Sequence, residues 1–265
     1  MDPKTLDTLA ERLRTASDTG TSCAPLVKDY PDLTIDDAYR VQHANVARRI
    51  TSGARLVGRK VGLTNFAVQK QLGISEPDFG HLFDDMSIKD GGTFDLSRTH
   101  NPRAEAEVAF VLGDGLAGPG VTAADVWSAT AYVLPAIEII DSRVADWDIT
   151  IVDTVADNAS SLAFVLGGAP VGPDAVDWSV AGMALRKNGR VASTGAGAAS
   201  LGHPVNAVVW LANRLGAAGE SLRAGDIVLS GALGPVIPVV PGDVVDADIA
   251  HLGRVSVRFT GEGAV

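Results

Sequence analysis

One expected β-strand with two glutamates on the same face constrains this chain more than any other feature of its sequence. Val, Phe and Leu dominate the second half of the stretch 103–113, and Gly113 ends it, which is typical of a strand. Side chains alternate along a strand, so Glu105 and Glu107 point to the same face, about 7 Å apart. This pair of acids is the first candidate for a functional site.

A third acid, Glu138, lies inside another apolar run, 132–140. A carboxylate between isoleucines is expected to be buried or half-buried, and burying it without a partner costs several kcal/mol. We hypothesise that Glu105, Glu107 and Glu138 meet around one divalent cation. Ligands that are all oxygen atoms favour a hard ion, Mg²⁺ or Mn²⁺.

Two simpler interpretations of these acids stay open at this point. Glutamates at alternate strand positions often form a solvated face of a sheet. That interpretation suits Glu138 less well, because its neighbours on both sides are apolar. For Glu138 the simpler alternative is an ion pair with Arg103 or Arg143. Spacing alone therefore does not decide in favour of a metal site.

Composition and charge limit the partners and the compartment. The chain has 265 residues, enough for one large domain or two small ones, and 46% of them are hydrophobic. Its formal charge of −10 argues against nucleic acid and against an anionic membrane surface as partners. The single cysteine, Cys23, suits a reducing cytoplasm. With no signal-like N-terminus and no apolar run of about 20 residues, we expect a soluble cytoplasmic protein.

Periodicity divides the chain into two parts. Residues 2–17 and 34–50 carry helical patterns, and we expect a helical segment, 1–53, packed on the core. Short strands and glycines follow, which predicts a catalytic domain, 54–265, with one structural domain overall. The residues after Gly261 are expected to fray.

Two titratable side chains stand next to glycines or turn residues. Lys60 lies in an expected strand between Gly58 and Gly62, where the backbone can approach a ligand closely. A surface lysine is the alternative there. Asp78 lies in the stretch 76–80, whose composition predicts a turn or loop.

Two later loops carry further candidates. The small polar stretch 155–161 contains Ser160 and leads into an apolar strand, so it can either bind a ligand's oxygens or simply form turns. The strand 225–230 runs into the glycine-rich loop 231–235, which can present backbone N–H groups to a carboxylate. The GxxxxGK[ST] pattern is missing, so this is not a phosphate-binding loop.

Seven stretches spread over nearly the whole chain resemble one known family, the 2-keto-4-pentenoate hydratases (2-hydroxypenta-2,4-dienoate hydratases) of the fumarylacetoacetate hydrolase superfamily. Their order and spacing are hard to produce by chance. The stretches are GRKVGLT (58–64), PDFG (77–80), PRAEAE (102–107), LPAIE (134–138), VDTVADNAS (152–160), LGHP (201–204) and GALGP (231–235).

This resemblance implies an α+β fold with N-terminal helices and a mixed, β-rich rolled sheet of the fumarylacetoacetate hydrolase C-terminal-domain type. It also implies a homo-oligomer, either a pentamer or a decamer, and a bound Mg²⁺ or Mn²⁺. The implied residues are the metal ligands Glu105, Glu107 and Glu138, the catalytic pair Lys60 and Asp78, and the substrate-binding residues Ser160, Leu233 and Gly234.

The activity implied by the resemblance is the metal-dependent hydration of 2-hydroxypenta-2,4-dienoate to 4-hydroxy-2-oxopentanoate, in the meta-cleavage degradation of aromatic compounds. Association with the downstream aldolase is a further expectation. The alternatives are a 4-oxalocrotonate decarboxylase and a hydratase of a longer hexadienoate or dicarboxylate substrate. A non-catalytic assembly partner belongs to a different class, and the presence of all the implied metal and lysine positions argues against it.

Overall fold

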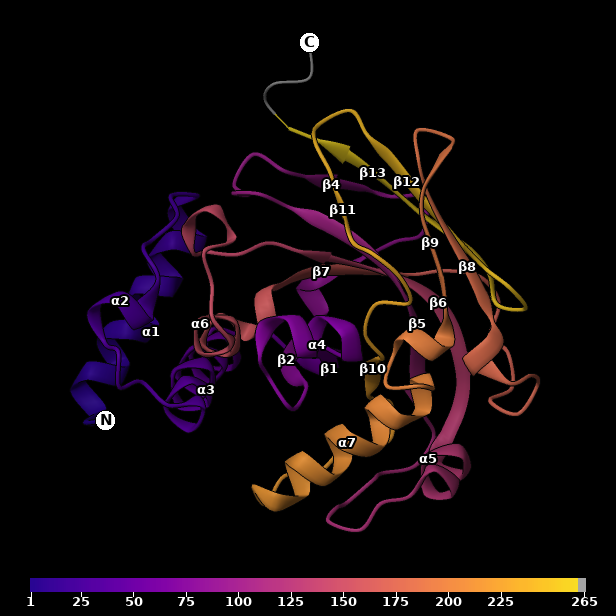
Figure 1. Ribbon diagram of the computed structural model, residues 1–265, viewed down its shortest axis with the longest axis horizontal. Coiled ribbons are helices and arrows are strands. Elements are labelled where there is room, and N and C mark those ends of the chain that lie inside the picture. The colour runs from indigo at the N-terminus through magenta and orange to yellow at the C-terminus, as the bar shows by residue number, and fades with distance from the viewer. Residues whose placement is uncertain (262–265) are drawn as a thin grey trace.

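A strongly curled sheet forms the body of the molecule, with the N-terminal helices at one end (Figure 1). The computed structural model describes residues 1–261, and the predicted fraying after Gly261 lies outside them. Most neighbouring strands run antiparallel, but β1–β10 and β3–β7 are parallel, so the sheet is mixed. In spatial order its strands are β2 (Asp78–Phe83), β1 (Leu56–Gly62), β10 (Ile227–Leu229), β5 (Arg103–Leu112), β6 (Thr130–Ile140), β7 (Ser161–Leu166) and β3 (Ser87–Ile88), with β11 (Ile237–Pro238) also paired to β5.

A second sheet packs against β5, β6 and β7 of the first. The facing side chains form one apolar core, which includes Phe110, Ile137 and Val165 from the first sheet and Val255 from the second. The second sheet consists, in spatial order, of β4 (Thr93–Asp95), β13 (Gly253–Thr260), β12 (Val244–Ile249), β8 (Gly182–Lys187) and β9 (Arg190–Ala196).

The helices cover the outside of this body. Both predicted N-terminal helices are present, and each begins at a side-chain cap: Asp2 accepts from the Thr5 amide and Thr34 from the Asp37 amide. The helices are α1 (Pro3–Thr19), α2 (Leu26–Asp29), α3 (Ile35–Thr51), α4 (Phe66–Leu72), α5 (Ala123–Ala129), α6 (Ile151–Ala156) and α7 (Pro204–Ala217).

One buried side chain joins the N-terminal helices to the sheet. Gln42 of α3 donates from Nε2 to the carbonyl oxygens of Phe79 in β2, at 3.0 Å, and Val155 in α6, at 2.8 Å. The predicted α+β class, with a mixed rolled sheet and N-terminal helices, is confirmed. The division into a segment 1–53 and a domain 54–265 stays a prediction. Within residues 1–261, none of the helices combines the length and apolarity needed to cross a membrane.

The loop prediction for residues 76–80 is wrong at its C-terminal half. Strand β2 begins at Asp78 and pairs antiparallel with β1, so that Gly62 lies opposite Asp78 and Lys60 opposite Gly80. Proline, aspartate and glycine have low strand propensity, but pairing with a buried neighbouring strand outweighs that local preference. This pairing brings Asp78 next to Lys60.

The β8–β9 hairpin packs so closely on the loop after β10 that one glycine has no room for a side chain. A β-carbon on Gly195 would lie 1.8 Å from the Leu233 carbonyl oxygen, a backbone atom, whereas one on Gly182 of the same hairpin would meet nothing within 4 Å. Gly195→Ala should therefore lower the free energy of unfolding by at least about 1–3 kcal/mol.

Chemical denaturation of Gly195→Ala and of the matched control Gly182→Ala tests this expectation. The control should unfold close to wild type. Equal stability of the two variants would mean that the hairpin and the loop are not packed as described.

Candidate active site

Strand register brings the three predicted acids together. Side-chain alternation puts Glu105 and Glu107 on one face of β5, and the β5–β6 pairing sets Glu105 directly opposite Glu138. Carboxylate oxygens of all three lie within 4.8 Å of one another. The same face continues as Ala109, Ala136, Leu229 and Phe164, all of them buried, so the acids stand at one end of an apolar surface.

Burial raises the proton affinity of these carboxylates. The exposed fraction is 7% for Glu105 and 0% for both Glu107 and Glu138. Loss of solvation, together with the neighbouring Glu138 charge, raises the pKa of Glu105 to about 8. The same two causes, with the charge of Glu105 added, raise the pKa of Glu107 well above its ordinary value. The solvated-face interpretation of this strand is therefore wrong.

Lys60 is the cation that faces the acids. Its Nζ lies 3.2 Å from Glu138 Oε2 as an ion pair and donates a hydrogen bond to the Ala159 carbonyl oxygen at 3.0 Å. Burial alone would lower the pKa of this ammonium, but the surrounding carboxylates, first among them Glu138, raise it above its ordinary value. Lys60 is 3% exposed, so the surface-lysine interpretation is wrong as well.

The two arginines considered as partners of Glu138 are engaged elsewhere. Arg143 pairs with Asp157, with 2.5 Å between Nε and Oδ1. The Arg103 guanidinium stacks on the Trp147 ring, 4.3 Å from its centroid. The ion pair expected for Glu138 exists, but its cation is Lys60.

Asp78 stands beside Lys60 because Gly62 leaves the space free. A β-carbon on Gly62 would lie 2.2 Å from Asp78 Oδ1 and 3.4 Å from Lys60 Nζ. Loss of solvation raises the pKa of Asp78 to about 6, against the opposing effect of the Lys60 charge. Asp78 Oδ2 is buried and finds no hydrogen-bond partner in the described part of the chain. A carboxyl group with these properties can hold or release a proton near neutral pH.

The predicted substrate-binding residues Ser160, Leu233 and Gly234 differ in what they contact. The Ser160 hydroxyl is buried and has no hydrogen-bond partner among residues 1–261. Leu233 donates its backbone N–H to the Ala106 carbonyl at 2.9 Å, between the two glutamates of β5, while its side chain is part of the core. Gly234 follows it and packs against the Thr194 carbonyl of β9.

The glycine-rich loop binds a carboxylate of the protein itself. The Gly231 N–H donates to Glu107 Oε2 at 2.6 Å. The sequence predicted that this loop can present N–H groups to a carboxylate, but it could not identify Glu107 as that carboxylate. Gly231 has a φ of +90°, and a β-carbon there would lie 2.2 Å from Thr64 Oγ1, so only glycine fits.

The three acids fit a hard divalent cation. Glu107 Oε1 and Glu138 Oε1 are buried and make no hydrogen bond to any residue between 1 and 261, whereas Glu138 Oε2 lies in the ion pair with Lys60. Unpaired buried carboxylate oxygens are costly unless a cation or a proton compensates them. An all-oxygen donor set suits Mg²⁺, Mn²⁺ or Ca²⁺ more than Zn²⁺.

Sequence reasoning missed the backbone turn that contacts Lys60. Asn158, Ala159 and Ser160 all have left-handed φ values, of 56°, 50° and 54°. The stretch was identified only as small and polar. Asparagine tolerates this conformation, which is a weak signal, but alanine and serine give none.

Known proteins resemble this chain over nearly its whole length. The sequence profile described as "Fumarylacetoacetate (FAA) hydrolase C-terminal" matches residues 60–260. The 2-keto-4-pentenoate hydratase of Paraburkholderia xenovorans (strain LB400) is 51% identical over 259 residues, which is 98% of this chain and 96% of that protein. The 2-hydroxyhexa-2,4-dienoate hydratase of Comamonas testosteroni is 44% identical over 261 residues, 98% and 99% of the two chains.

A solved structure extends the comparison to the whole fold. The 4-oxalocrotonate decarboxylase from Pseudomonas putida G7, complexed with magnesium and adipate, superposes with a TM-score of 0.95 at 39% identity and covers 98% of both chains. Fold and acid cluster together define a fumarylacetoacetate-hydrolase-type enzyme site. The chain belongs to the fumarylacetoacetate hydrolase family, and within it to the group that contains the 2-keto-4-pentenoate hydratases.

The raised pKa values predict how pH acts on the metal-free protein. Glu105 ionises near pH 4.5 when unfolded but near pH 8 when folded, so the unfolded state loses its proton first. The stability contributed by the protonated group is complete below about pH 4.5 and is lost as pH rises through about 8. A cation that requires ionised ligands should oppose this loss, most strongly at pH 8.

Thermal unfolding with a chelator and with added Mg²⁺ or Mn²⁺, between pH 5 and pH 8, measures both effects. The chelated protein should melt at lower temperature as pH rises, and the metal should raise that temperature most at pH 8. Glu105→Gln, which removes one titrating group, should show a weaker pH dependence. A pH-independent melting temperature in the chelated wild type would contradict the buried cluster.

Proposed function

We propose that the protein is a metal-dependent hydratase that converts 2-hydroxypenta-2,4-dienoate and water into 4-hydroxy-2-oxopentanoate, in the meta-cleavage degradation of aromatic compounds. The observation that carries the proposal is the buried cluster of Glu105, Glu107 and Glu138 beside Lys60. Relatives that match over 98% of the chain carry hydratase names, which supports the same reaction.

Glu105, Glu107 and Glu138 would hold the cation, and Mg²⁺ or Mn²⁺ is our proposal for its identity. A divalent ion there acts as a Lewis acid that stabilises negative charge on the 2-oxygen of the substrate. Two positive charges of the ion and one of Lys60 match the three negative charges of the ionised glutamates. Neighbouring structures with magnesium and with calcium support a divalent ion.

The protein's own groups must move the protons. The dienol becomes the 2-oxo-3-enoate when its 2-hydroxyl loses a proton and C5 gains one; water then adds its hydroxyl to C4 and a proton to C3. Asp78 Oδ2, buried and without a partner in residues 1–261, can hold or release a proton near neutral pH. The surrounding carboxylates keep Lys60 protonated, so its ammonium group can donate a proton to the substrate and take it back.

The charges around the site favour a substrate with one carboxylate. Lys60 is the positive charge that acts most strongly on Glu105, Glu107 and Asp78. Arg59, its neighbour on β1, points to the other face of the sheet and pairs with Glu220. A dicarboxylate such as the decarboxylase substrate needs a second cation, so we place hydration ahead of decarboxylation. Pentadienoate and hexadienoate differ by one methyl group, worth about 1–3 kcal/mol in a pocket.

The setting of the reaction is also a proposal. We infer a homo-oligomer, pentamer or decamer, that works in the cytoplasm and passes its hydroxy-oxo acid to an aldolase. The family resemblance supports the assembly, and the single Cys23 suits a reducing compartment. The complete set of acids and Lys60 speaks against a role as a non-catalytic scaffold.

A steady-state assay of the two dienols tests the function. Loss of dienol absorbance should require Mg²⁺ or Mn²⁺ and stop with chelator, and the product should be the 4-hydroxy-2-oxo acid without release of CO₂. Incubation with 4-oxalocrotonate is the control. Release of CO₂ from that acid, with inert dienols, would overturn hydration in favour of decarboxylation.

Variants of Lys60 and Glu138 should separate proton transfer from metal binding. Lys60→Ala should lower kcat by about 10²–10⁴-fold and leave the affinity for the metal unchanged, because it removes a group needed for proton transfer. Glu138→Gln should weaken metal affinity, because a neutral amide replaces a ligand charge. Calorimetric metal titrations and kcat measure the two effects. Unchanged turnover in Lys60→Ala, or wild-type affinity in Glu138→Gln, would remove that residue from its role.

A further inference from the structure

A left-handed turn, residues 158–160, follows α6 and contacts β1, the strand that carries Lys60, and β2. Its three residues have φ values of 56°, 50° and 54°, a conformation that costs free energy for any residue with a β-carbon. Such backbone persists only where its surroundings hold it. Ala159 and Ser160 are each 2% exposed, so the contacts that hold this turn come from the protein and not from solvent.

On its inner side this turn fixes the reactive end of Lys60. The Ala159 carbonyl accepts a hydrogen bond from Lys60 Nζ at 3.0 Å, and Glu138 Oε2 lies 3.2 Å from the same nitrogen. The direction of the Ala159 C=O bond follows from the backbone angles of the turn. In a right-handed turn this bond would point in another direction, away from Lys60. The position of the ammonium therefore depends on the conformation of the turn.

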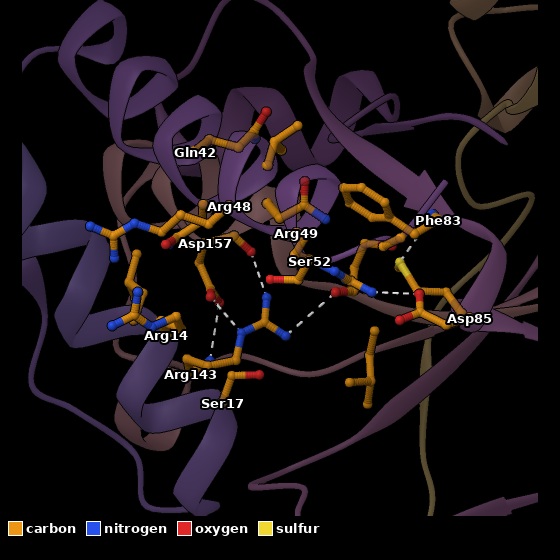
Figure 2. A pocket seen from close by; sticks show the side chains of 18 of the residues that line it. Arg14, Ser17, Gln42, Arg48, Arg49, Ser52, Phe83, Asp85, Arg143 and Asp157 are labelled. Atoms are coloured by element: carbon orange, nitrogen blue, oxygen red, sulfur yellow. Dashed lines mark hydrogen bonds and ion pairs between the residues drawn. The ribbon is translucent and has the colours of Figure 1, made fainter. Parts of the chain in front are cut away.

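On its outer side a buried ion pair holds the start of the turn. Arg143 donates to Asp157 three times: from its backbone N–H to a carboxylate oxygen at 3.0 Å, from Nε to the other carboxylate oxygen at 2.5 Å, and from Nη2 to the Asp157 carbonyl at 2.5 Å. Figure 2 shows this pair at the edge of a cavity. The cavity has a volume of about 940 Å³, and residues of α1 and α3 also line it. The exposed fraction is 6% for Arg143 and 4% for Asp157, so each buried charge is compensated by the other and not by water.

A second clamp ties the turn to strand β2. The Asn158 side chain accepts from the His81 N–H at 2.8 Å and donates to the His81 carbonyl at 3.0 Å, so it satisfies both backbone groups of one residue. The Asn158 carbonyl comes so near Gly80 that a β-carbon there would lie 2.3 Å from it. Gly80 is the residue paired with Lys60 across β1 and β2.

We propose that Asn158, together with the Arg143–Asp157 pair, positions Lys60 for catalysis by holding the left-handed turn. The Arg143–Asp157 pair holds the residue before the turn, and Asn158 ties the first residue of the turn to β2; neither clamp bonds Glu105, Glu107 or Glu138. The inference rests on the proposed function, in which Lys60 takes part in proton transfer. Removing a clamp should slow the chemical step, because a small displacement of a catalytic group costs rate far more than binding.

The main test compares Asn158→Ala with a control on the adjoining helix. Asn158→Ala removes both bonds to His81 and should lower kcat about 10- to 100-fold with KM within about twofold. The control is Asp153→Asn: the Asp153 side chain is also buried, accepts from the Thr150 N–H at 3.0 Å in the capping box of α6 and from the Leu26 N–H at 2.6 Å, and does not bond the turn. It should lower thermal stability and leave kcat near wild type.

A double variant separates positioning from a general loss of structure. If Asn158 acts through Lys60, adding Asn158→Ala to Lys60→Ala should change the residual kcat by less than about twofold. The same loss of kcat in both backgrounds would overturn the proposal. So would an effect confined to KM, or a loss of kcat in Asp153→Asn equal to that in Asn158→Ala.

A structural measurement keeps the test independent of activity. A crystal structure of Asn158→Ala should show Lys60 Nζ beyond hydrogen-bond distance of the Ala159 oxygen, whereas wild type should show the bond. An intact bond in the variant would overturn the inference. A wild-type enzyme that shows the bond but does not hydrate dienols would overturn the proposed function alone. If Asn158→Ala does not fold, the isosteric Asp157→Asn, which weakens the other clamp, takes its place in each comparison.

Discussion

The confinement of three carboxylates to one dry face of a sheet is the constraint on which the site depends. Glu105, Glu107 and Glu138 repel one another and are removed from water, and their oxygens lie within 4.8 Å of one another. Within residues 1–261, two groups compensate the cluster: the Lys60 ammonium, 3.2 Å from Glu138, and the Gly231 N–H, which donates to Glu107. The burial of these acids lowers local stability and leaves a donor set that suits a hard divalent ion.

The same constraint explains why the neighbouring backbone is unusual. Gly62 leaves room for Asp78 beside Lys60, and Gly231 can turn its N–H toward Glu107 because it lacks a β-carbon. The left-handed turn offers its Ala159 carbonyl to Lys60. Each of these features places a polar group of the protein where water cannot reach. Glycines and left-handed backbone are therefore found close to the acids.

Sequence reasoning located the acids but described their surroundings poorly. Alternation gave the shared face of Glu105 and Glu107, because a strand has a period of two residues wherever it occurs. Local propensity predicts a loop at Asp78, since it cannot anticipate pairing with β1. Arg103 and Arg143 were the candidate partners of Glu138, but the cation proved to be Lys60, 78 positions earlier in the chain.

By itself the sequence determined the α+β class, the two N-terminal helices, and the three acids with Lys60 as candidates, because these follow from periodicity and a family resemblance. Only the tertiary structure decided that Glu105 faces Glu138, that Asp78 enters a strand next to Lys60, and that a turn at Ala159 fixes the ammonium. The physical reason is that contacts between segments distant in the chain set the strand register, the burial and the left-handed backbone. A local sequence pattern cannot predict those contacts.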